Sequence, residues 1–142
     1  MLKLTSVVYT SSAVKRFSEG ELVSLLQQSR ENNLRLGITG LLLYKDLDFM
    51  QVIEGEEYTM QKLSSRIERD PRHRAYTELR WEAIQERRFP DWSRGFRNLE
   101  NVGIGQIPGY SLFMDEPLTS TRFKADPSRA EKLLLLFREK RT

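Results

Sequence analysis

Apolar and polar positions change their spacing several times along the first hundred residues of the chain, and each spacing predicts an element. Alternation predicts strands, because successive side chains of a strand point to opposite faces. Spacings of three and four predict helices with one apolar face. We expect strands at 2–9, 38–44 and 49–54, helices from about 19 to 33 and from Gly55 to before Pro71, a fourth strand in which Leu79, Trp81 and Ala83 alternate, and a fifth in which Trp92, Arg94 and Phe96 alternate.

Polar residues and breakers mark the ends of these elements. The first strand should end in the polar turn Thr10-Ser11-Ser12, and 45–48 should form a hairpin loop. Ser18, followed three residues later by Glu21, forms a capping box that opens the first helix. The resulting order, βαββαββ, predicts an α+β fold of ferredoxin-like type, a sandwich in which two helices cover one face of a mixed sheet.

The pattern changes after Asn101, where glycine and proline recur and strand alternation stops. The last segment, 128–140, predicts a helix with a second possible capping box, formed by Ser128 and Glu131. Its apolar run 133–137 covers more than one helix face, so the helix should meet two surfaces. One could be the far face of the sheet and the other a partner; alternatively, the helix only covers the sheet. We therefore divide the chain into a domain at 1–98 and a linker with a helical extension at 99–142.

Two primary amides stand at positions where the pattern predicts apolar side chains. Asn33 continues the buried stripe of the first helix, and Gln51 shares a strand face with Phe49. A buried amide without partners costs about 1–3 kcal/mol. Tyr9 could meet Gln51 if the first and third strands are neighbours, with Asn33 facing the same cleft. Either the amides pair with stray backbone groups, or they converge on a polar ligand.

Composition excludes several kinds of chemistry. The chain has 142 residues, a net charge of +3, one histidine and no cysteine. It is long enough for one domain with a real core. Disulfides, thiolate catalysis and His or Cys metal clusters are excluded. Glu54, Glu56 and Glu57 fit helix-start electrostatics better than acid–base catalysis. The short apolar N-terminus predicts neither a signal peptide nor a membrane span, so we expect a soluble cytoplasmic protein.

Several ordered motifs resemble those of one known family. They are Tyr9 with Ser11; Asn33 followed by Gly37-Ile38-Thr39-Gly40 and Leu42-Leu43-Tyr44; Phe49-x-Gln51-x-x-Glu54-Gly55; Asp70-Pro71-Arg72-His73; and Phe89-Pro90-x-Trp92-Ser93. Together they resemble the BLUF domain, a flavin-binding blue-light sensor, over about residues 1–98. The tail resembles the C-terminal helices of short, stand-alone BLUF proteins.

The resemblance implies a flavin, FAD or alternatively FMN, held between the two helices. The residue matching Tyr9 donates an electron and then a proton to the excited flavin. The residue matching Gln51 bridges tyrosine and flavin, and its hydrogen bonds rearrange by rotation or tautomerisation. The residue matching Asn33 binds the polar edge of the flavin ring.

Further site residues follow from the same match. By the resemblance, Asn32 and His73 flank the ring and Arg66 or Arg72 binds its carbonyl oxygen. Arg66 could instead be a solvated surface arginine, and His73 an exposed loop residue. Trp92 is counted with Tyr9 and Gln51 among the photoactive residues. Where BLUF domains commonly carry methionine the chain has Arg94, which we expect to point outward or to the sheet edge, leaving the placement of Trp92 open.

The expected function is therefore that of a blue-light photoreceptor without net chemical turnover, hence not an enzyme. Its output would be altered contact with an unknown downstream protein, or with its own copies as a homo-oligomer, through the far sheet face and the C-terminal helix. Neither nucleic acid nor membrane is expected as a partner. The alternatives are a ferredoxin-like RNA- or ligand-binding module without photochemistry, which would lack an RNP-type aromatic signature here, and a flavin-dependent redox enzyme, which would lack a substrate-side acid or base.

Overall fold

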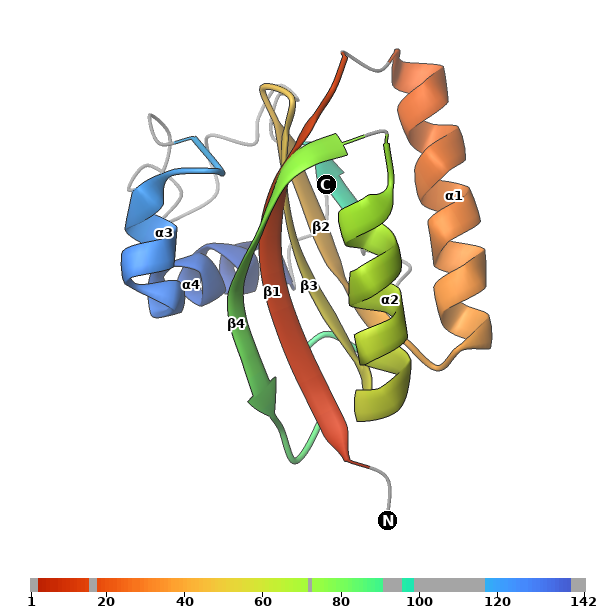
Figure 1. The fold of residues 1–142 in the computed structure, drawn as a ribbon, viewed down its shortest axis with the longest axis vertical. Helices are drawn as coiled ribbons and strands as arrows, with labels where there is room; N and C mark the ends of the chain where they lie inside the picture. Colours follow the sequence, from red (N-terminus) through yellow and green to blue (C-terminus); the bar gives the residue numbers. More distant parts are fainter. Residues whose placement is uncertain (1–2, 16–17, 72, 91–95, 99–116, 139–142) are drawn as a thin grey trace.

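A computed structural model describes residues 3–15, 18–71, 73–90, 96–98 and 117–138 (Figure 1). The elements follow in the order β1 (Leu4–Ala13), α1 (Glu19–Arg35), β2 (Thr39–Lys45), β3 (Asp48–Glu56), α2 (Glu57–Arg69), β4 (His73–Ala83), β5 (Phe96–Asn98), α3 (Thr121–Ala125) and α4 (Pro127–Arg138). The predicted βαββαββ order is confirmed, and the short helix α3 is an addition that the sequence pattern did not predict. No helix within the described ranges is both long and apolar enough to cross a bilayer.

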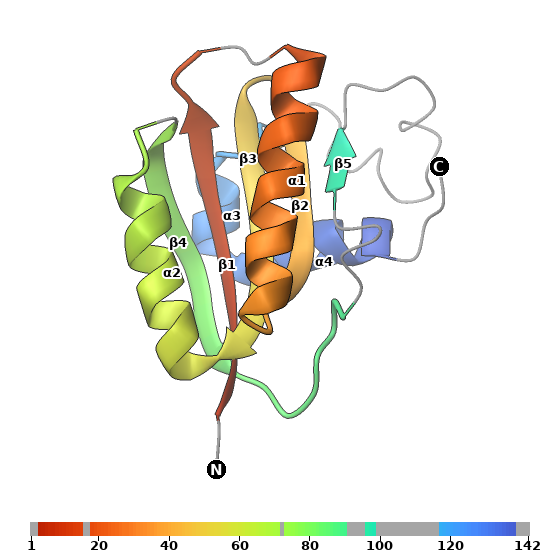
Figure 2. The ribbon, with the colours of Figure 1, turned by 90° about the vertical axis from the view of Figure 1, so that its right-hand side faces the viewer.

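The five strands form one mixed sheet in the order β4-β1-β3-β2-β5. All neighbours are antiparallel except β2 and β5, which run parallel. Helices α1 and α2 stand on one face of the sheet, and α3 and α4 stand on the other (Figures 1 and 2). We call these the front face and the far face. The predicted α+β, ferredoxin-like arrangement with two helices on one face is therefore confirmed.

Each face has its own apolar core. On the front face Val7, Tyr9, Ile38, Ile53 and Met60 are buried together. On the far face, side chains of β1, β2 and β3 pack against the two C-terminal helices; they are Val8, Leu41, Leu43, Met50 and Val52 with Phe89, Leu118, Phe123, Ala130, Leu133 and Leu134. Leu133 and Leu134 are almost fully buried, whereas Leu135 is 39% exposed. The C-terminal helix therefore covers the far face, as one of the two sequence-based expectations held.

The first strand does not end in the polar turn that its sequence predicts. It continues through Thr10-Ser11-Ser12 to Ala13, and it is paired on both sides, with β3 and with β4. The Ser12 hydroxyl donates a hydrogen bond of 2.8 Å to Asp48 Oδ1, at the matching position of β3. Because the ladder already satisfies the backbone, hydroxyl side chains do not interrupt this strand.

The helix starts follow the sequence in one case and depart from it in another. Before α1, Ser18 Oγ accepts from the Glu21 backbone N–H at 3.1 Å, and Glu21 Oε1 accepts from the Ser18 N–H at 3.0 Å. That capping box is confirmed. The second predicted box, at Ser128 and Glu131, is wrong, because Asp126 Oδ1 accepts from the Ser128 N–H at 3.2 Å and the helix begins at Pro127. Proline at the first helical position has no N–H to leave unsatisfied.

Irregular pairing in β4 breaks the predicted alternation of Leu79, Trp81 and Ala83. The register between β1 and β4 shifts between Val8 and Tyr9, and again between Thr10 and Ser12. After the first shift Leu79 packs against the far-face core, whereas Trp81 packs against the front-face core. Next to the second shift Ala75 has φ 56°, a left-handed conformation that is uncommon for alanine. Such bulges re-aim side chains and are frequent beside functional sites.

Candidate functional site

The predicted meeting of Tyr9 and Gln51 is present at the centre of the sheet. The two residues are direct partners in the β1–β3 ladder, and both are buried, at 5% and 9% exposure. The Tyr9 hydroxyl donates a hydrogen bond to Oε1 of Gln51. Both side chains point to the front face, because Tyr9 belongs to the front-face core with Val7 and Ile53.

The surroundings keep Tyr9 protonated and leave part of Gln51 free. Burial raises the pKa of the Tyr9 phenol far above its ordinary value, and Tyr76 and Asp70 add to the effect. The phenol is therefore a hydrogen-bond donor throughout the physiological pH range. It occupies the oxygen of the Gln51 amide, and the amide nitrogen has no hydrogen bond to any residue in the described ranges. Gln51 thus has two donors to offer a third group.

Asn33 contributes a second amide with unused capacity. It lies in the last turn of α1, is 6% exposed, and its side chain bonds to no residue of the described part. Its backbone carbonyl accepts from the N–H groups of Leu36 at 3.0 Å and Ile38 at 2.8 Å. Gly37, with φ 71°, takes the left-handed conformation that this helix end requires. The amide is therefore held at a fixed backbone position, next to the start of β2.

Tyr76 is a neighbour of Tyr9 that sequence analysis missed. The two rings lie 4.9 Å apart between centroids, tilted by 33°. The hydroxyls of Tyr76 and Ser64 are buried without a hydrogen-bond partner in the described ranges. They line a cavity of about 450 Å³ together with Ser65, Glu68, Thr77, Glu78 and Lys124. Burial raises the pKa of Tyr76 to about 12, although the nearby Ser64 hydroxyl acts in the opposite direction. From the sequence, only the position of Tyr76 in a strand near Tyr9 could have indicated that it belongs to the site.

The structure brings the remaining predicted residues together only in part. Asn32 is half-buried, and its Oδ1 accepts a hydrogen bond of 2.5 Å from Arg35. Arg66 is exposed on α2. His73 begins β4, where its backbone pairs with Ala13, so it does not lie in a loop. Arg72, Trp92 and Arg94 lie outside the described residues.

Glu54 has a role that differs from the predicted helix-start electrostatics. It is fully buried on the far face and accepts hydrogen bonds from the backbone N–H groups of Arg88, at 3.0 Å, and Phe89, at 2.8 Å. Glu56 instead caps α2, accepting from the N–H groups of Tyr58 and Thr59, and Glu57 lies in the first helical turn. The prediction thus holds for Glu56 and Glu57. It is wrong for Glu54, whose strand position turns its carboxylate away from the helix.

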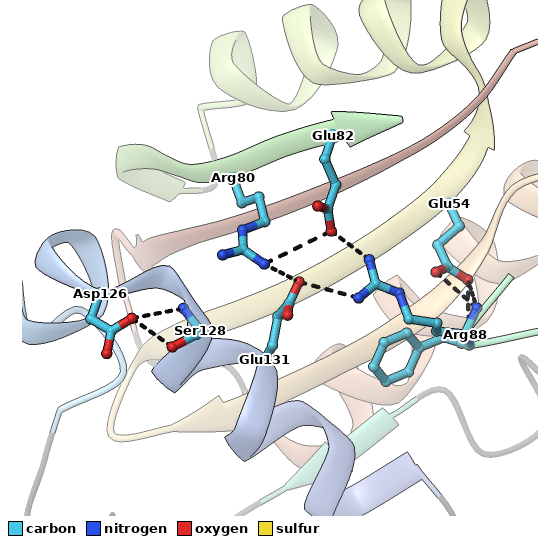
Figure 3. A network of polar contacts seen from close by, with 8 residues as sticks. Glu54, Arg80, Glu82, Arg88, Asp126, Ser128 and Glu131 are labelled. Carbon is cyan, nitrogen blue, oxygen red and sulfur yellow. Dashed lines mark hydrogen bonds and ion pairs between the residues drawn. The ribbon is translucent and has the colours of Figure 1, made fainter. Parts of the chain in front are cut away.

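An ion-pair ring joins the sheet to α4 on the far face. Arg80 and Glu82 come from β4, Arg88 from the segment after it, and Glu131 from α4 (Figure 3). The nitrogen–oxygen distances around the ring are 2.7 Å for Arg80–Glu131, 3.4 Å for Glu131–Arg88, 2.5 Å for Arg88–Glu82 and 3.9 Å for Glu82–Arg80. We call this set the far-face ring.

The far-face ring shifts the ionisation of its members. Burial tends to raise the pKa of Glu82, but the hydrogen bond and charge of Arg88, together with Arg80, hold that pKa below its ordinary value. Burial likewise opposes the charge of Arg88, and the carboxylates around it raise its pKa nonetheless. The charged forms of Glu82 and Arg88 are therefore favoured by their partners in the ring. Among the residues described, no three potential ligand side chains gather into a metal site.

Comparisons with known proteins agree on one family. The BLUF family model, described as "Sensors of blue-light using FAD", matches residues 4–95. The chain is 35% identical over 91 residues to photoactivated adenylate cyclase subunit beta of Euglena longa, covering 63% of this chain and 11% of that protein. It is 28% identical over 86 residues to the blue light- and temperature-regulated antirepressor BluF of Escherichia coli (strain K12), covering 61% of this chain and 21% of that protein. The chain thus spans only about a tenth of the cyclase subunits that it matches.

Solved structures extend the likeness over almost the whole chain. The dark-state structure of BlrB, a BLUF protein, is 31% identical, with a TM-score of 0.76 and 96% of each chain covered. A bacterial light-regulated adenylyl cyclase is 30% identical, with a TM-score of 0.72, covering 96% of this chain and 40% of that one. The photo-activated state of BlsA is 24% identical with a TM-score of 0.79, which supports the fold alone.

Proposed function

The chain belongs to the BLUF family of blue-light sensors that use FAD, and from this membership we propose that its photochemistry runs through the hydrogen bond between Tyr9 and Gln51. As a member of the family it is a flavin-binding blue-light photoreceptor. The single observation that carries the proposal is the Tyr9 hydroxyl donating to a Gln51 amide whose nitrogen is unoccupied.

The polar groups on the front face fit a flavin ring. A flavin presents carbonyl oxygens and ring nitrogens along one edge, and these need amide partners when they are buried. Gln51 offers two N–H donors, and Asn33 offers both a donor and an acceptor from the end of α1. When bound, the flavin absorbs blue light and accepts an electron and a proton. FAD is the cofactor named for the family, and FMN is the alternative for this chain.

The chain's own part in the switch is a reversal of one amide. In the dark Tyr9 would donate to the Gln51 oxygen, as it does in this structure, and the Gln51 nitrogen would be available to donate to the flavin. A primary amide carries a donor on one side and an acceptor on the other, so rotating or tautomerising it changes the hydrogen bonds of both neighbours with little movement. Tyr9 supplies the electron and the proton, and its raised pKa keeps that proton in place until light arrives.

Other residues are assigned supporting roles by their match to the family. Asn33 holds the polar edge of the ring, Asn32 and His73 flank it, and Arg66 or Arg72 binds its carbonyl oxygen. Trp92, which lies outside the described residues, is assigned to the photoactive set by the same match. Arg66 is exposed on α2, and a long arginine side chain could reach inward from there to serve this role.

We further propose that the output is a change in protein contacts, without net turnover. Residues 1–98 form the photosensory unit, and 99–142 form the extension that transmits the signal. The partner is a downstream protein, or further copies of this chain, bound through the far face and the C-terminal helix; nucleic acid and membranes are not partners, and the protein is cytoplasmic. Support comes from α4, which covers the far face while leaving Leu135 exposed.

The test uses two substitutions in the photoactive pair and one beside it. Tyr9→Phe and Gln51→Leu should both keep bound flavin but lose the light-induced spectral shift, because each removes one side of the hydrogen bond. Tyr76→Phe is the matched control, since it removes a neighbouring buried phenol that has no hydrogen-bond partner in the described ranges. The control should keep the shift. Normal shifts in both variants would refute the assigned roles.

A further inference from the structure

Two functional side chains of β3 lie three positions apart and point to opposite faces of the sheet. Gln51 faces the front, where Tyr9 donates to it, and Glu54 faces the far side. Glu54 is fully buried, so its carboxylate must be compensated by the groups that donate to it. A movement of β3 that accompanies a change at Gln51 would therefore act directly on the groups that hydrogen-bond to Glu54.

Glu54 holds the segment that follows β4. Its carboxylate accepts from the backbone N–H groups of Arg88 and Phe89, and its backbone carbonyl accepts from Arg87 Nη1 at 2.8 Å. The Arg87 guanidinium is also bonded to the Thr39 hydroxyl and the Gly37 carbonyl, both at 2.7 Å. This segment is thus tied to β3 and to the start of β2.

Arg88 makes hydrogen bonds through both its backbone and its side chain. Its backbone N–H is held by Glu54 of β3, while its side chain bonds Glu82 at 2.5 Å and Glu131 of α4 at 3.4 Å. Figure 3 shows the guanidinium lying between these two carboxylates. The next side chain, Phe89, is buried in the far-face core beside the leucines of α4. One residue therefore touches both the central strand and the C-terminal helix.

We propose that Arg88 is a positioning residue that couples β3 to α4, so that a rearrangement at Gln51 reaches the C-terminal helix through Glu54 and Arg88. The inference rests on the proposed function, since it specifies how the photoactive pair communicates with the extension. Buried charge-assisted hydrogen bonds suit this role, because they are directional and lose much of their strength when the geometry changes.

Arg80 provides an internal comparison. It belongs to the same far-face ring and makes the shorter contact with Glu131, 2.7 Å. Its backbone, however, lies in β4, opposite Val8 of β1, and the backbone donors to the Glu54 carboxylate are those of Arg88 and Phe89 instead. Both arginines help to hold α4, but only Arg88 links it to the strand that carries Gln51. Loss of either arginine should loosen α4 equally in the dark. Only loss of Arg88 should weaken the light-induced change in α4.

The experiment measures hydrogen exchange along α4 in the full-length, FAD-loaded protein, in the dark and under blue light. The parent and Arg80→Gln should show a light-induced change in exchange of at least about threefold. Arg88→Gln should show less than a third of that change while keeping its flavin spectral shift. In the dark, both substitutions should raise exchange in α4 by a similar factor.

Further variants separate the possible failures. Glu131→Gln weakens the contacts of both arginines from the α4 side; because Arg80→Gln alone should keep the light response, this variant should reproduce the loss seen in Arg88→Gln. Arg88→Lys should restore the light response only in part, because an ammonium lacks the fork that spans both carboxylates. Equal light responses in Arg80→Gln and Arg88→Gln would overturn the coupling role. A parent with a spectral shift but no change in α4 would overturn the coupling and the output through α4, whereas absence of any spectral shift would refute the proposed photochemistry itself.

Discussion

The two faces of the sheet carry polar groups of opposite kinds. On the front face Tyr9, Gln51 and Asn33 are neutral and buried, and only one hydrogen bond joins them within the described ranges. On the far face Glu54 accepts from backbone N–H groups, and the far-face ring joins arginines to glutamates through ion pairs. The strand β3 contributes Gln51 to one face and Glu54 to the other.

This difference suits the front face to rearrangement and the far face to rigid attachment. Neutral amides with spare donors can exchange partners at low cost, so the front face suits a site that rearranges. Saturated contacts resist rearrangement, most of all at the fully buried Glu54, because removing its donors would leave a buried carboxylate uncompensated. The far face therefore suits a rigid connection between the sheet and α4. The following predictions test whether the faces differ in this way.

The largest expected effect is on stability, from the far face. Glu54→Ala should lower the free energy of unfolding by about 2–6 kcal/mol, because two backbone N–H groups would lose their acceptor at about 1–3 kcal/mol each. Glu56→Ala, two residues further on, removes only the cap of α2 and should cost about 0.5–2 kcal/mol. Urea unfolding of both variants measures the difference. Equal losses would mean that Glu54 is an ordinary surface carboxylate.

Asn33→Ala should instead affect cofactor binding. If the Asn33 amide pairs with the flavin edge, its removal should weaken flavin affinity by about 1–3 kcal/mol while leaving the stability of the flavin-free protein nearly unchanged. Asn32→Ala is the neighbouring control, and its effect should be smaller because the Asn32 oxygen is already bonded to Arg35. Flavin titration followed by fluorescence quenching measures both. An unchanged affinity in Asn33→Ala would remove Asn33 from the site.

Acid should weaken the far face before it affects the photoactive pair. The folded-state pKa of Glu82 is depressed, so the stability that Glu82 contributes is present above its ordinary pKa and is lost as pH falls through the folded value. The ring is partly exposed, and the loss should stay below about 1 kcal/mol. Hydrogen exchange in α4 should therefore rise on acidification. Glu82→Gln should lack this part of the rise; an identical acid profile would show that the ring does not hold α4.

The smallest effect is expected from the Tyr76 hydroxyl. Tyr76→Phe should change stability at neutral pH by less than about 1 kcal/mol, and in the stabilising direction, because a buried hydroxyl without a partner is removed. Because the folded-state pKa is about 12, the unfolded phenol ionises first, and the stability contributed by Tyr76 is lost as pH rises above 10. The variant should lose less stability in that range. Tyr58→Phe, an exposed tyrosine, should follow the parent.

Sequence patterns predicted the fold and the centre of the site, but few of the long-range polar contacts. Alternation located the strands, although β1 continues to Ala13, and the pairing of β1 with β3 places Tyr9 opposite Gln51. The irregular pairing in β4 was not predicted, because no glycine marks Ala75 as a residue with positive φ. The role of Glu54 was missed because its donors are backbone groups 34 and 35 residues away, and backbone groups leave no trace in side-chain patterns.

The C-terminal region shows the same limit in another form. The leucine run correctly predicted a helix, and two of its leucines are buried against the sheet; a second surface for this helix stays a prediction. Arg80 and Arg88 pair with Glu131 of the same helix. The sequence could not single them out from the many other charged residues, because the pairing depends on the sheet face to which a bulge turns each side chain. The local sequence pattern thus predicted the helices and strands, whereas the tertiary structure determines which charged residues form ion pairs.

The most direct measurement of the central claim is the absorption spectrum of the purified chain, recorded before and after blue light in the parent and in Tyr9→Phe. The account predicts a flavin spectrum in both proteins. It predicts a light-induced shift that reverses in the dark in the parent and is absent in the variant. A colourless protein that takes up no added flavin, or a shift that persists without the Tyr9 hydroxyl, would contradict the account.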